Sequence, residues 1–266
     1  MNLTDPQSSQ ENEYNIPYHF LMSQSSILAF PKKIYTAPIY LYYLERIIEV
    51  IMEYHNGGSI FDAGCGDGRL LYELRKQNSN IKISGLDYSE RAVSFAKIFN
   101  PGIEIQIADL TQNIPFEDDS FDTVISVETL EHIEPAKIPL VMGNFQKMLK
   151  GNGVLIVTVP HKNRPLDLKH YQHYQHFSSH TLIKLLEPYF DIESTHGYHH
   201  ASKGRNLILK IITILYYFLY PLKKLGLSSL LNWISNLGFS YFQRFLYRCD
   251  VDSGLSLICV CRNHNR

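Results

Sequence analysis

From residue 59 onward, short apolar segments rich in β-branched residues alternate with segments whose apolar residues recur every three or four positions. The first kind predicts strands at 59–64, 81–87, 103–108, 121–127, 153–160, 190–198 and 254–262. The second kind predicts helices that lie on a sheet, at 68–77, 89–99, 135–149 and 178–189. Such alternation is typical of βαβ units, so we expect an α/β fold with a doubly wound, seven-stranded, mostly parallel sheet.

The segment SIFDAGCGDGRL, residues 59–70, joins the first predicted strand to the helix that follows it. Glycines occupy alternate positions in this loop, at Gly64, Gly66 and Gly68. A loop of this kind leaves bare backbone and a helix N-terminus at the carboxyl edge of the sheet, where open α/β sheets bind ligands. A simple turn needs fewer glycines, because each one costs backbone entropy on folding. We therefore expect a nucleotide-like ligand at this loop.

Two aspartates in the same loop distinguish between classes of ligand. The dinucleotide pattern is GxGxxG, whereas here the third glycine comes one residue early and Asp62 stands two positions before the first. Carboxylates at Asp62 and Asp67 would repel a pyrophosphate and attract a ligand with a cationic amino-acid end. S-adenosylmethionine has an ammonium and a sulfonium but no phosphate. The loop therefore favours this cofactor over a dinucleotide.

The next two predicted strands each end in another acid. Asp87 follows the second strand in GLDYS, where its carboxylate can accept hydrogen bonds from both ribose hydroxyls. Asp109 follows the third strand in IADL, where it can accept a hydrogen bond from the exocyclic amine of an adenine. Three successive strand ends therefore present one acid each to a ligand at the edge of the sheet.

These motifs together resemble the class I S-adenosylmethionine-dependent methyltransferases. FDAGCGDGRL is similar to the glycine-rich first motif of that family, LDYSE to the second, ADL to the third, and FDTVISVETLEHI to the fourth strand with its following turn. The resemblance covers residues 59–200 and the closing segment GLSLICVCR. It implies a Rossmann-like sheet whose last strand is antiparallel. It also implies that S-adenosylmethionine is held by Asp62, Ala63, Gly64, Cys65, Gly66, Asp87, Tyr88, Ala108, Asp109, Leu110 and Val127.

In such an enzyme, an oxygen, nitrogen or carbon of the acceptor attacks the sulfonium methyl group. The protein then aligns the reactants and removes a proton from an oxygen nucleophile. Candidate residues lie after the fourth strand in SVETLEHIE, where Glu128, Glu131 and His132 occupy positions i, i+3 and i+4. One helical turn would gather two carboxylates and an imidazole on one face, and such a cluster could hold a divalent metal.

A polar segment after the fifth strand carries histidines at 161, 170, 173, 176 and 180. The ExxEH pattern with a later HF resembles the O-methyltransferases of ubiquinone biosynthesis and the enzymes that methylate the 3′-terminal 2′-hydroxyl of small RNAs. The second resemblance implies a metal on Glu128, Glu131, His132 and His176, and this mixed ligand set favours Mn²⁺, Fe²⁺ or Zn²⁺ over Mg²⁺. The same pattern also occurs in members of the family without metal, so we expect a site without metal in which His132 or His176 is the catalytic general base, and the metal site is the alternative.

Residues 205–248 form a long apolar insertion between the last two predicted strands. Its first part contains Lys210 and Pro221 and is shorter than the roughly 20 residues that a membrane-spanning helix needs. We expect a helical insertion that covers the substrate site, and an in-plane membrane contact through its basic residues is the alternative. Residues 1–36 are predicted to be an N-terminal tail and lead-in, and a helix at 37–54 opens the methyltransferase domain, 37–266.

Composition and charge indicate which partners and which cellular compartment to expect. The 266 residues carry a formal net charge of −1, which provides no global field for a polyanion, so no nucleic-acid partner is expected. Four cysteines are too few for a disulfide scaffold, and the start MNLTDPQSSQENEYN lacks the regions of a signal peptide. We therefore expect a cytoplasmic protein, with a membrane contact only if the insertion provides one.

The function we expect is methyl transfer to an oxygen of a small-molecule, lipid-linked or glycan acceptor. One alternative is an NAD(P)-dependent oxidoreductase, which the glycine spacing disfavours. The other is a non-catalytic protein that binds S-adenosylmethionine, and the intact Asp62, Asp87 and Asp109 argue against it. The sequence predicts no particular oligomeric state.

Overall fold

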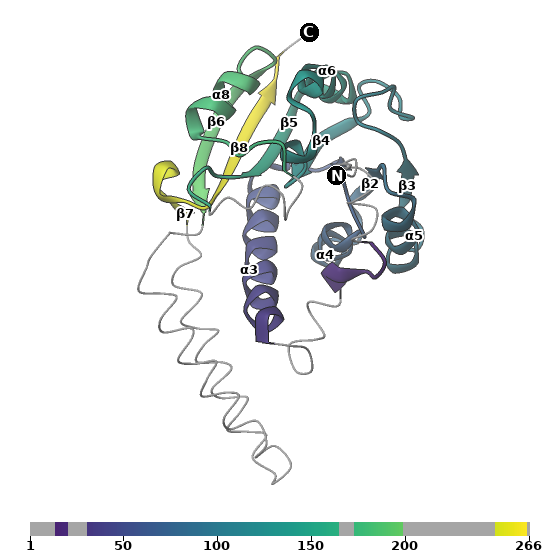
Figure 1. The fold of residues 1–266 in the computed structure, drawn as a ribbon. Coiled ribbons are helices and arrows are strands. Elements are labelled where there is room, and N and C mark those ends of the chain that lie inside the picture. Colours follow the sequence, from purple (N-terminus) through teal and green to yellow (C-terminus); the bar gives the residue numbers. More distant parts are fainter. Residues whose placement is uncertain (1–13, 21–30, 165–172, 199–247, 265–266) are drawn as a thin grey trace, which may run out of the picture.

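The computed structural model describes residues 14–20, 31–164, 173–198 and 248–264. Within these ranges, eight strands form one sheet in the order β3-β2-β1-β4-β5-β8-β6-β7 (Figure 1). The strands are β1 Ser59–Ala63, β2 Lys82–Asp87, β3 Glu104–Ile107, β4 Phe121–Val127, β5 Leu149–Pro160, β6 Phe190–Tyr198, β7 Arg248–Cys249 and β8 Ser256–Asn263.

The predicted strand pattern is confirmed, with one addition. β1 to β6 run in the same direction, and β8 lies antiparallel between β5 and β6. β7 pairs with the end of β6 and adds an eighth strand at the edge. The sequence did not indicate β7, because two residues are too few to form an apolar pattern. The strand order reverses between β1 and β4, and open α/β sheets bind their ligands at such a switch point.

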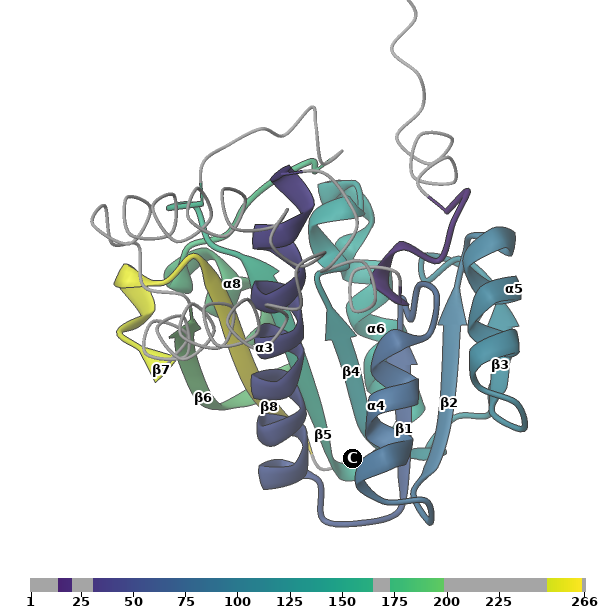
Figure 2. The same ribbon diagram turned by 90° about the horizontal axis from the view of Figure 1, so that it is seen from below.

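Helices cover both faces of the sheet, as Figures 1 and 2 show. On one face lie α3 Pro31–Tyr54, α4 Arg69–Gln77 and α5 Glu90–Phe99, and on the other lie α6 Ile138–Met148 and α8 Ser179–Leu186. Successive strand residues point to opposite faces, so Ile60 packs against the first group of helices and Phe61 against the second. Burial on both faces explains why the strands are almost continuously apolar.

The helices that follow β1 and β2 begin at residues suited to that position. Gly68 precedes α4 with φ of 79°, a left-handed conformation that favours glycine. The Ser89 hydroxyl accepts a hydrogen bond from the Ala92 amide at 3.1 Å and caps the start of α5. Both helices therefore begin at the carboxyl edge of the sheet.

The N-terminal part of the fold differs from the predicted bounds. α3 begins at Pro31, six residues before the predicted start at 37, so the predicted lead-in contains the first turns of this helix. Residues 14–20 are also described, and Tyr14 and Phe20 are buried. Residues 14–20 and 31–36 of the predicted tail therefore belong to the folded structure.

The apolar insertion, 205–248, lies outside the described residues apart from Arg248, which belongs to β7. Its two predicted roles, as a cover for the site or as a membrane contact, therefore stay predictions. No helix within the described ranges combines the length and apolar character that crossing a membrane requires.

Candidate active site

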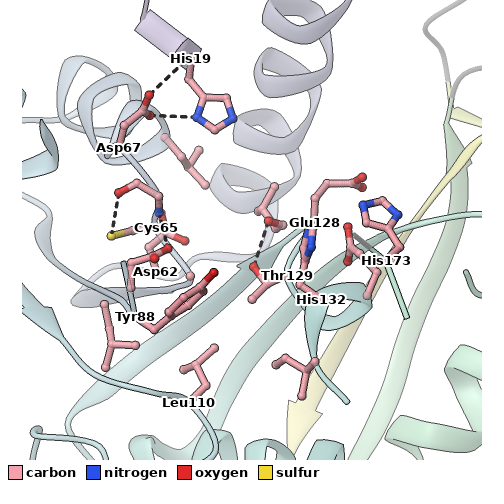
Figure 3. A pocket seen from close by; sticks show the side chains of 18 of the residues that line it. His19, Asp62, Cys65, Asp67, Tyr88, Leu110, Glu128, Thr129, His132 and His173 are labelled. Atoms are coloured by element: carbon pink, nitrogen blue, oxygen red, sulfur yellow. Dashed lines mark hydrogen bonds and ion pairs between the residues drawn. The ribbon is translucent and has the colours of Figure 1, made fainter. Parts of the chain in front are cut away.

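A cavity of about 800 Å³ lies at the carboxyl edge of the sheet, at the switch point between β1 and β4. This volume is within the range of pockets that bind cofactors and small substrates. Ten of the eleven residues predicted to bind the cofactor line the cavity. The exception is Ala63, whose side chain is fully buried in the core beneath α6. Figure 3 shows Asp62, Cys65 and Tyr88 on one side of the cavity and Glu128, His132 and His173 on the other.

The glycine loop takes a shape that larger residues would not permit. Gly64 has φ of 90°, and a Cβ at this position would lie 2.6 Å from the Thr129 side chain. Gly66 has φ of 54°, and its amide donates a hydrogen bond to Asp87 Oδ2 at 2.8 Å. The loop from β1 is therefore tied to the end of β2, and both glycines are needed for this close approach.

Asp87 and Asp109 end their strands as the sequence predicts. The second oxygen of Asp87, Oδ1, accepts a hydrogen bond from the Ser89 amide at 2.9 Å, so two backbone amides fix its carboxylate at the cavity wall. Asp109 Oδ1 accepts bonds from the amide and the hydroxyl of Thr111. Both carboxylates are thus oriented by the chain itself before a ligand arrives.

Asp62 is buried, with 2% of its surface exposed, and lies at the same wall of the cavity. Burial and the nearby charge of Asp87 raise the pKa of its carboxyl from 3.8 to about 8. In the free protein Asp62 therefore keeps a proton at neutral pH. An ammonium group bound beside it would favour the ionised carboxylate, so binding of such a group releases this proton.

This pKa predicts a pH dependence of cofactor binding. Between pH 5 and 7, below the pKa of about 8 for Asp62, affinity for S-adenosylhomocysteine should rise up to tenfold for each pH unit, because the carboxyl must ionise to pair with the ammonium. Calorimetric titrations at several pH values measure this slope. Asp62→Asn, which has no proton to lose, should bind weakly with a flat profile. A flat profile in the unmodified chain would show that Asp62 does not pair with the ammonium.

Asp67 has a different role from the one its sequence position suggests. It is fully buried, and its two oxygens accept hydrogen bonds from the amide and from Nδ1 of His19, both at 3.0 Å. Its carboxylate therefore holds residues 14–20 over the glycine loop and is already paired before any ligand binds. A Cβ on Gly66 would lie 2.6 Å from the Tyr14 hydroxyl, which shows how closely this segment approaches the loop.

The segment 14–20 is a part of the site that the sequence analysis missed. Phe20 stacks on Phe99 of α5 at 3.8 Å between ring centroids, and the Arg69 guanidinium lies 5.2 Å from the Phe20 ring. Tyr14, Tyr18 and His19 line the cavity. The available signal was the aromatic run YNIPYHF within an otherwise polar start.

At the other end of the cavity, the structure brings together Glu131, His132 and His173. Each offers one ligand atom, and these atoms all lie within 4.8 Å of one another. The His132 and His173 rings are perpendicular, with centroids 4.6 Å apart. Glu131 is fully buried, and within the described part of the chain neither carboxylate oxygen has a hydrogen-bond partner. Among the described residues, the two carboxylate oxygens of Glu131 therefore remain available to a group that enters the cavity.

Electrostatics keep two members of this cluster, Glu131 and His173, uncharged in the free protein. Burial, followed by the charge of Glu128, raises the pKa of the Glu131 carboxyl well above its usual range. Burial, followed by His132 and His176, lowers the pKa of His173 to about 3. His173 is therefore neutral at pH 7 and retains a nitrogen lone pair.

The structure changes the predicted metal set at two positions. Glu128 precedes the short 3₁₀ turn Leu130–His132 with φ of 49°, so it does not share a helical face with the other two. Its carboxylate instead accepts a hydrogen bond from the Tyr43 hydroxyl at 2.7 Å and pairs with Arg164 at 3.0 Å. His176 lies behind His173, with its Nε2 2.8 Å from His173 Nδ1, and does not line the cavity. His173 thus occupies the place predicted for His176.

A sequence profile of the methyltransferase domain family matches residues 54–200, just over half of the chain. The chain belongs to this family. Its members' cofactor is S-adenosylmethionine, and the cavity carries the acids and glycines that the resemblance implied for it. The chain therefore contains a methyltransferase domain of the S-adenosylmethionine-dependent kind, and neither an NAD(P)-dependent oxidoreductase nor a non-catalytic binding protein is favoured.

Solved structures support the fold of this methyltransferase. A TehB-like S-adenosylmethionine-dependent methyltransferase from Corynebacterium glutamicum has a TM-score of 0.57 at 15% identity, over 97% of this chain and 100% of that one. A possible histamine N-methyltransferase from Thermotoga maritima has a TM-score of 0.57 at 18% identity, over 94% of each chain. At these identities the likeness concerns the fold alone.

Sequence relatives correct the prediction about nucleic acid. The tRNA N(3)-methylcytidine methyltransferase Mettl2 of Drosophila melanogaster is 31% identical over 37% of this chain and 33% of its own length. The probable tRNA methyltransferase 9B of Homo sapiens is 36% identical over 33% of this chain and 18% of its own length. The chain thus matches a third or less of these relatives. These tRNA methyltransferases contradict the prediction of no nucleic-acid partner, which is therefore wrong. That prediction relied on net charge, which describes the whole chain and not the lining of one cavity.

Proposed function

We propose that this methyltransferase modifies a nitrogen or oxygen of an RNA nucleotide that enters the cavity as a single, unstacked unit. The tRNA methyltransferases among its relatives support an RNA acceptor. The observation that carries the proposal is the aromatic wall of the cavity. Five tyrosines outside the predicted cofactor set line it, and a base removed from its stack is held by stacking on such rings. They are Tyr14, Tyr18, Tyr40, Tyr43 and Tyr174.

Basic side chains on the lining are suited to the phosphates that flank such a nucleotide. Lys137 is paired with Glu134 at 3.3 Å, and both side chains are about half exposed. An exposed pair of this kind contributes little, so a phosphate can replace Glu134. Arg164 lies deeper and pairs with Glu128 beside the cluster. We therefore place the phosphates at the mouth and the reacting base or hydroxyl at the cluster.

The two ends of the cavity would bind the two reactants, the cofactor at one end and the acceptor at the other. The cofactor supplies an activated methyl group, and Asp62, Asp87 and Asp109 orient its polar ends. Glu131, His132 and His173 lie where an acceptor would be positioned. A neutral imidazole or an ionised carboxylate there can take the proton that an oxygen nucleophile loses.

Transfer of a labelled methyl group tests the proposal. The full chain is incubated with S-adenosylmethionine carrying a radioactive methyl group and with total tRNA, and label is expected in RNA that ribonuclease renders acid-soluble. Asp118→Ala, an exposed position, serves as an active control. Absence of label from tRNA and from total RNA, with cofactor binding intact, would contradict an RNA acceptor.

A second candidate is transfer to a hydroxyl of a small-molecule, lipid-linked or glycan acceptor. The observation that favours it is enclosure: α3 and residues 14–20 both contribute to the cavity wall, which leaves a pocket suited to a compact substrate. The same assay decides between the two, because label would then appear in the solvent-extracted, glycan or low-molecular-weight fraction and would resist ribonuclease.

A further inference from the structure

The starting observation is the carboxylate of Glu131. It is 0% exposed, it lies on the wall of the cavity, and neither of its oxygens has a hydrogen-bond partner among the described residues. A buried carboxylate without a partner is strongly unfavourable unless it binds a proton or a cation. Packing alone would favour an apolar side chain of similar size at this position. The orphaned oxygens therefore indicate a ligand.

Two imidazoles complete a compact donor set around this carboxylate. The ligand atoms of Glu131, His132 and His173 all lie within 4.8 Å of one another. Ligands bonded to one metal ion at about 2.0 to 2.3 Å lie roughly 3 to 4.5 Å apart, so only a small contraction is needed. We propose that Glu131, His132 and His173 bind one divalent first-row transition-metal ion at the acceptor end of the cavity.

The surroundings of the three residues match those of a metal site. His173 Nδ1 lies 2.8 Å from His176 Nε2, and in the tautomer in which His173 Nδ1 donates this hydrogen bond, the other ring nitrogen of His173 has its lone pair. Metal-bound histidines use such a second contact to fix the orientation of the ring. The remaining metal positions would face the cavity, which leaves room for an acceptor atom.

The chemistry of the donors indicates which ions bind. Two imidazoles and one carboxylate suit Mn²⁺, Fe²⁺ or Zn²⁺, whereas Mg²⁺ and Ca²⁺ prefer a set made of oxygen atoms. Glu128 would provide a second carboxylate, but Tyr43 and Arg164 already hold it. The site therefore has three protein ligands, and an ion there would orient the acceptor and lower the pKa of a bound hydroxyl.

Direct binding measurements on the full chain test this site without acceptor or cofactor. Metal-free protein is titrated with Mn²⁺, and free Mn²⁺ is followed by electron paramagnetic resonance. We expect one ion per chain, displacement by Zn²⁺, little competition from Mg²⁺, and a higher melting temperature with the ion bound. The variants Glu131→Gln and His173→Ala should each lose at least about tenfold in Mn²⁺ affinity.

Matched controls separate this site from the alternatives. His180→Ala changes an exposed histidine of α8, and Glu117→Gln changes an exposed acid away from the cavity lining, so both should keep Mn²⁺ affinity within about threefold. Glu131→Gln should fold about as stably as the unmodified chain, because a neutral amide of nearly the same size replaces a carboxyl whose pKa burial raises well above its usual range. Absence of stoichiometric Mn²⁺ and Zn²⁺ binding, or an unchanged affinity in Glu131→Gln, would overturn the site.

The inference deepens the proposed function, since it places a metal beside the RNA nucleotide, but the two can fail separately. One bound Mn²⁺ without RNA methylation would refute the acceptor and leave the site intact. RNA methylation by protein that binds no Mn²⁺ or Zn²⁺ would refute the metal and leave the acceptor intact.

Discussion

Replacing Asp87 with alanine is expected to weaken S-adenosylhomocysteine binding by about 100-fold or more. Hydrogen bonds to a charged group contribute about 1.5 to 3 kcal/mol each, and two ribose hydroxyls would lose their acceptor. The variant also removes the hydrogen bonds to the amides of Gly66 and Ser89, so the glycine loop loses its tie to β2. Both effects reduce affinity, because the loop and the carboxylate are held in place by the same contacts.

Calorimetry of the full chain measures this affinity, and circular dichroism establishes that the variant is folded. Asp118→Ala is the matched control, because Asp118 is an exposed carboxylate on the loop before β4. Asp87→Asn keeps the size of the side chain and one acceptor oxygen, so we expect an intermediate loss. A folded Asp87→Ala variant with unchanged affinity would remove Asp87 from the cofactor site.

Replacing Glu131 with glutamine is expected to slow methyl transfer by about 100- to 10,000-fold while cofactor affinity changes little. The carboxylate is buried against the cavity beside His132 and His173, which lie across the cavity from Asp62 in Figure 3. As a proton acceptor or as a metal ligand, it would act on the acceptor, so the loss should appear in turnover. The glutamine amide has nearly the same volume and leaves the packing intact.

Single-turnover transfer to the labelled fraction, RNA or another acceptor, measures the loss. Glu117→Gln, an exposed position before β4, should transfer at the rate of the unmodified chain. If Glu131→Gln transfers methyl groups at the unmodified rate, then the cluster is not at the acceptor and the assignment of the two ends of the cavity fails.

The fold could be predicted because its signals are local. Alternating strand and helix periods specify a sheet covered on both faces, and the glycine spacing at Gly64 and Gly66 specifies a loop that admits a ligand at the sheet edge. Asp87 and Asp109 lie at strand ends, and parallel strands bring such ends to the same edge. These residues therefore line the cavity that the sequence indicates.

The acceptor end was harder to predict, because its residues come from a short 3₁₀ turn and an irregular segment, and neither has a regular hydrophobic period. Glu128 was placed on one helical face with Glu131, yet the chain takes a left-handed conformation at Glu128 before a short 3₁₀ turn. His173 and His176 lie in a segment of several histidines, where spacing gives no reason to prefer either. Only the contact of that segment with Glu131 selected His173 for the cluster.

By itself, the sequence determined the class of fold, the glycine loop and the acids that line the same end of the cavity, because each depends on neighbours a few positions apart. The tertiary structure decided which residues meet from distant parts of the chain. Asp67 pairs with His19 across 48 positions, and Glu128 pairs with Tyr43 across 85. Such pairings follow from how helices and loops pack on the sheet, and packing has no period that can be read along a chain.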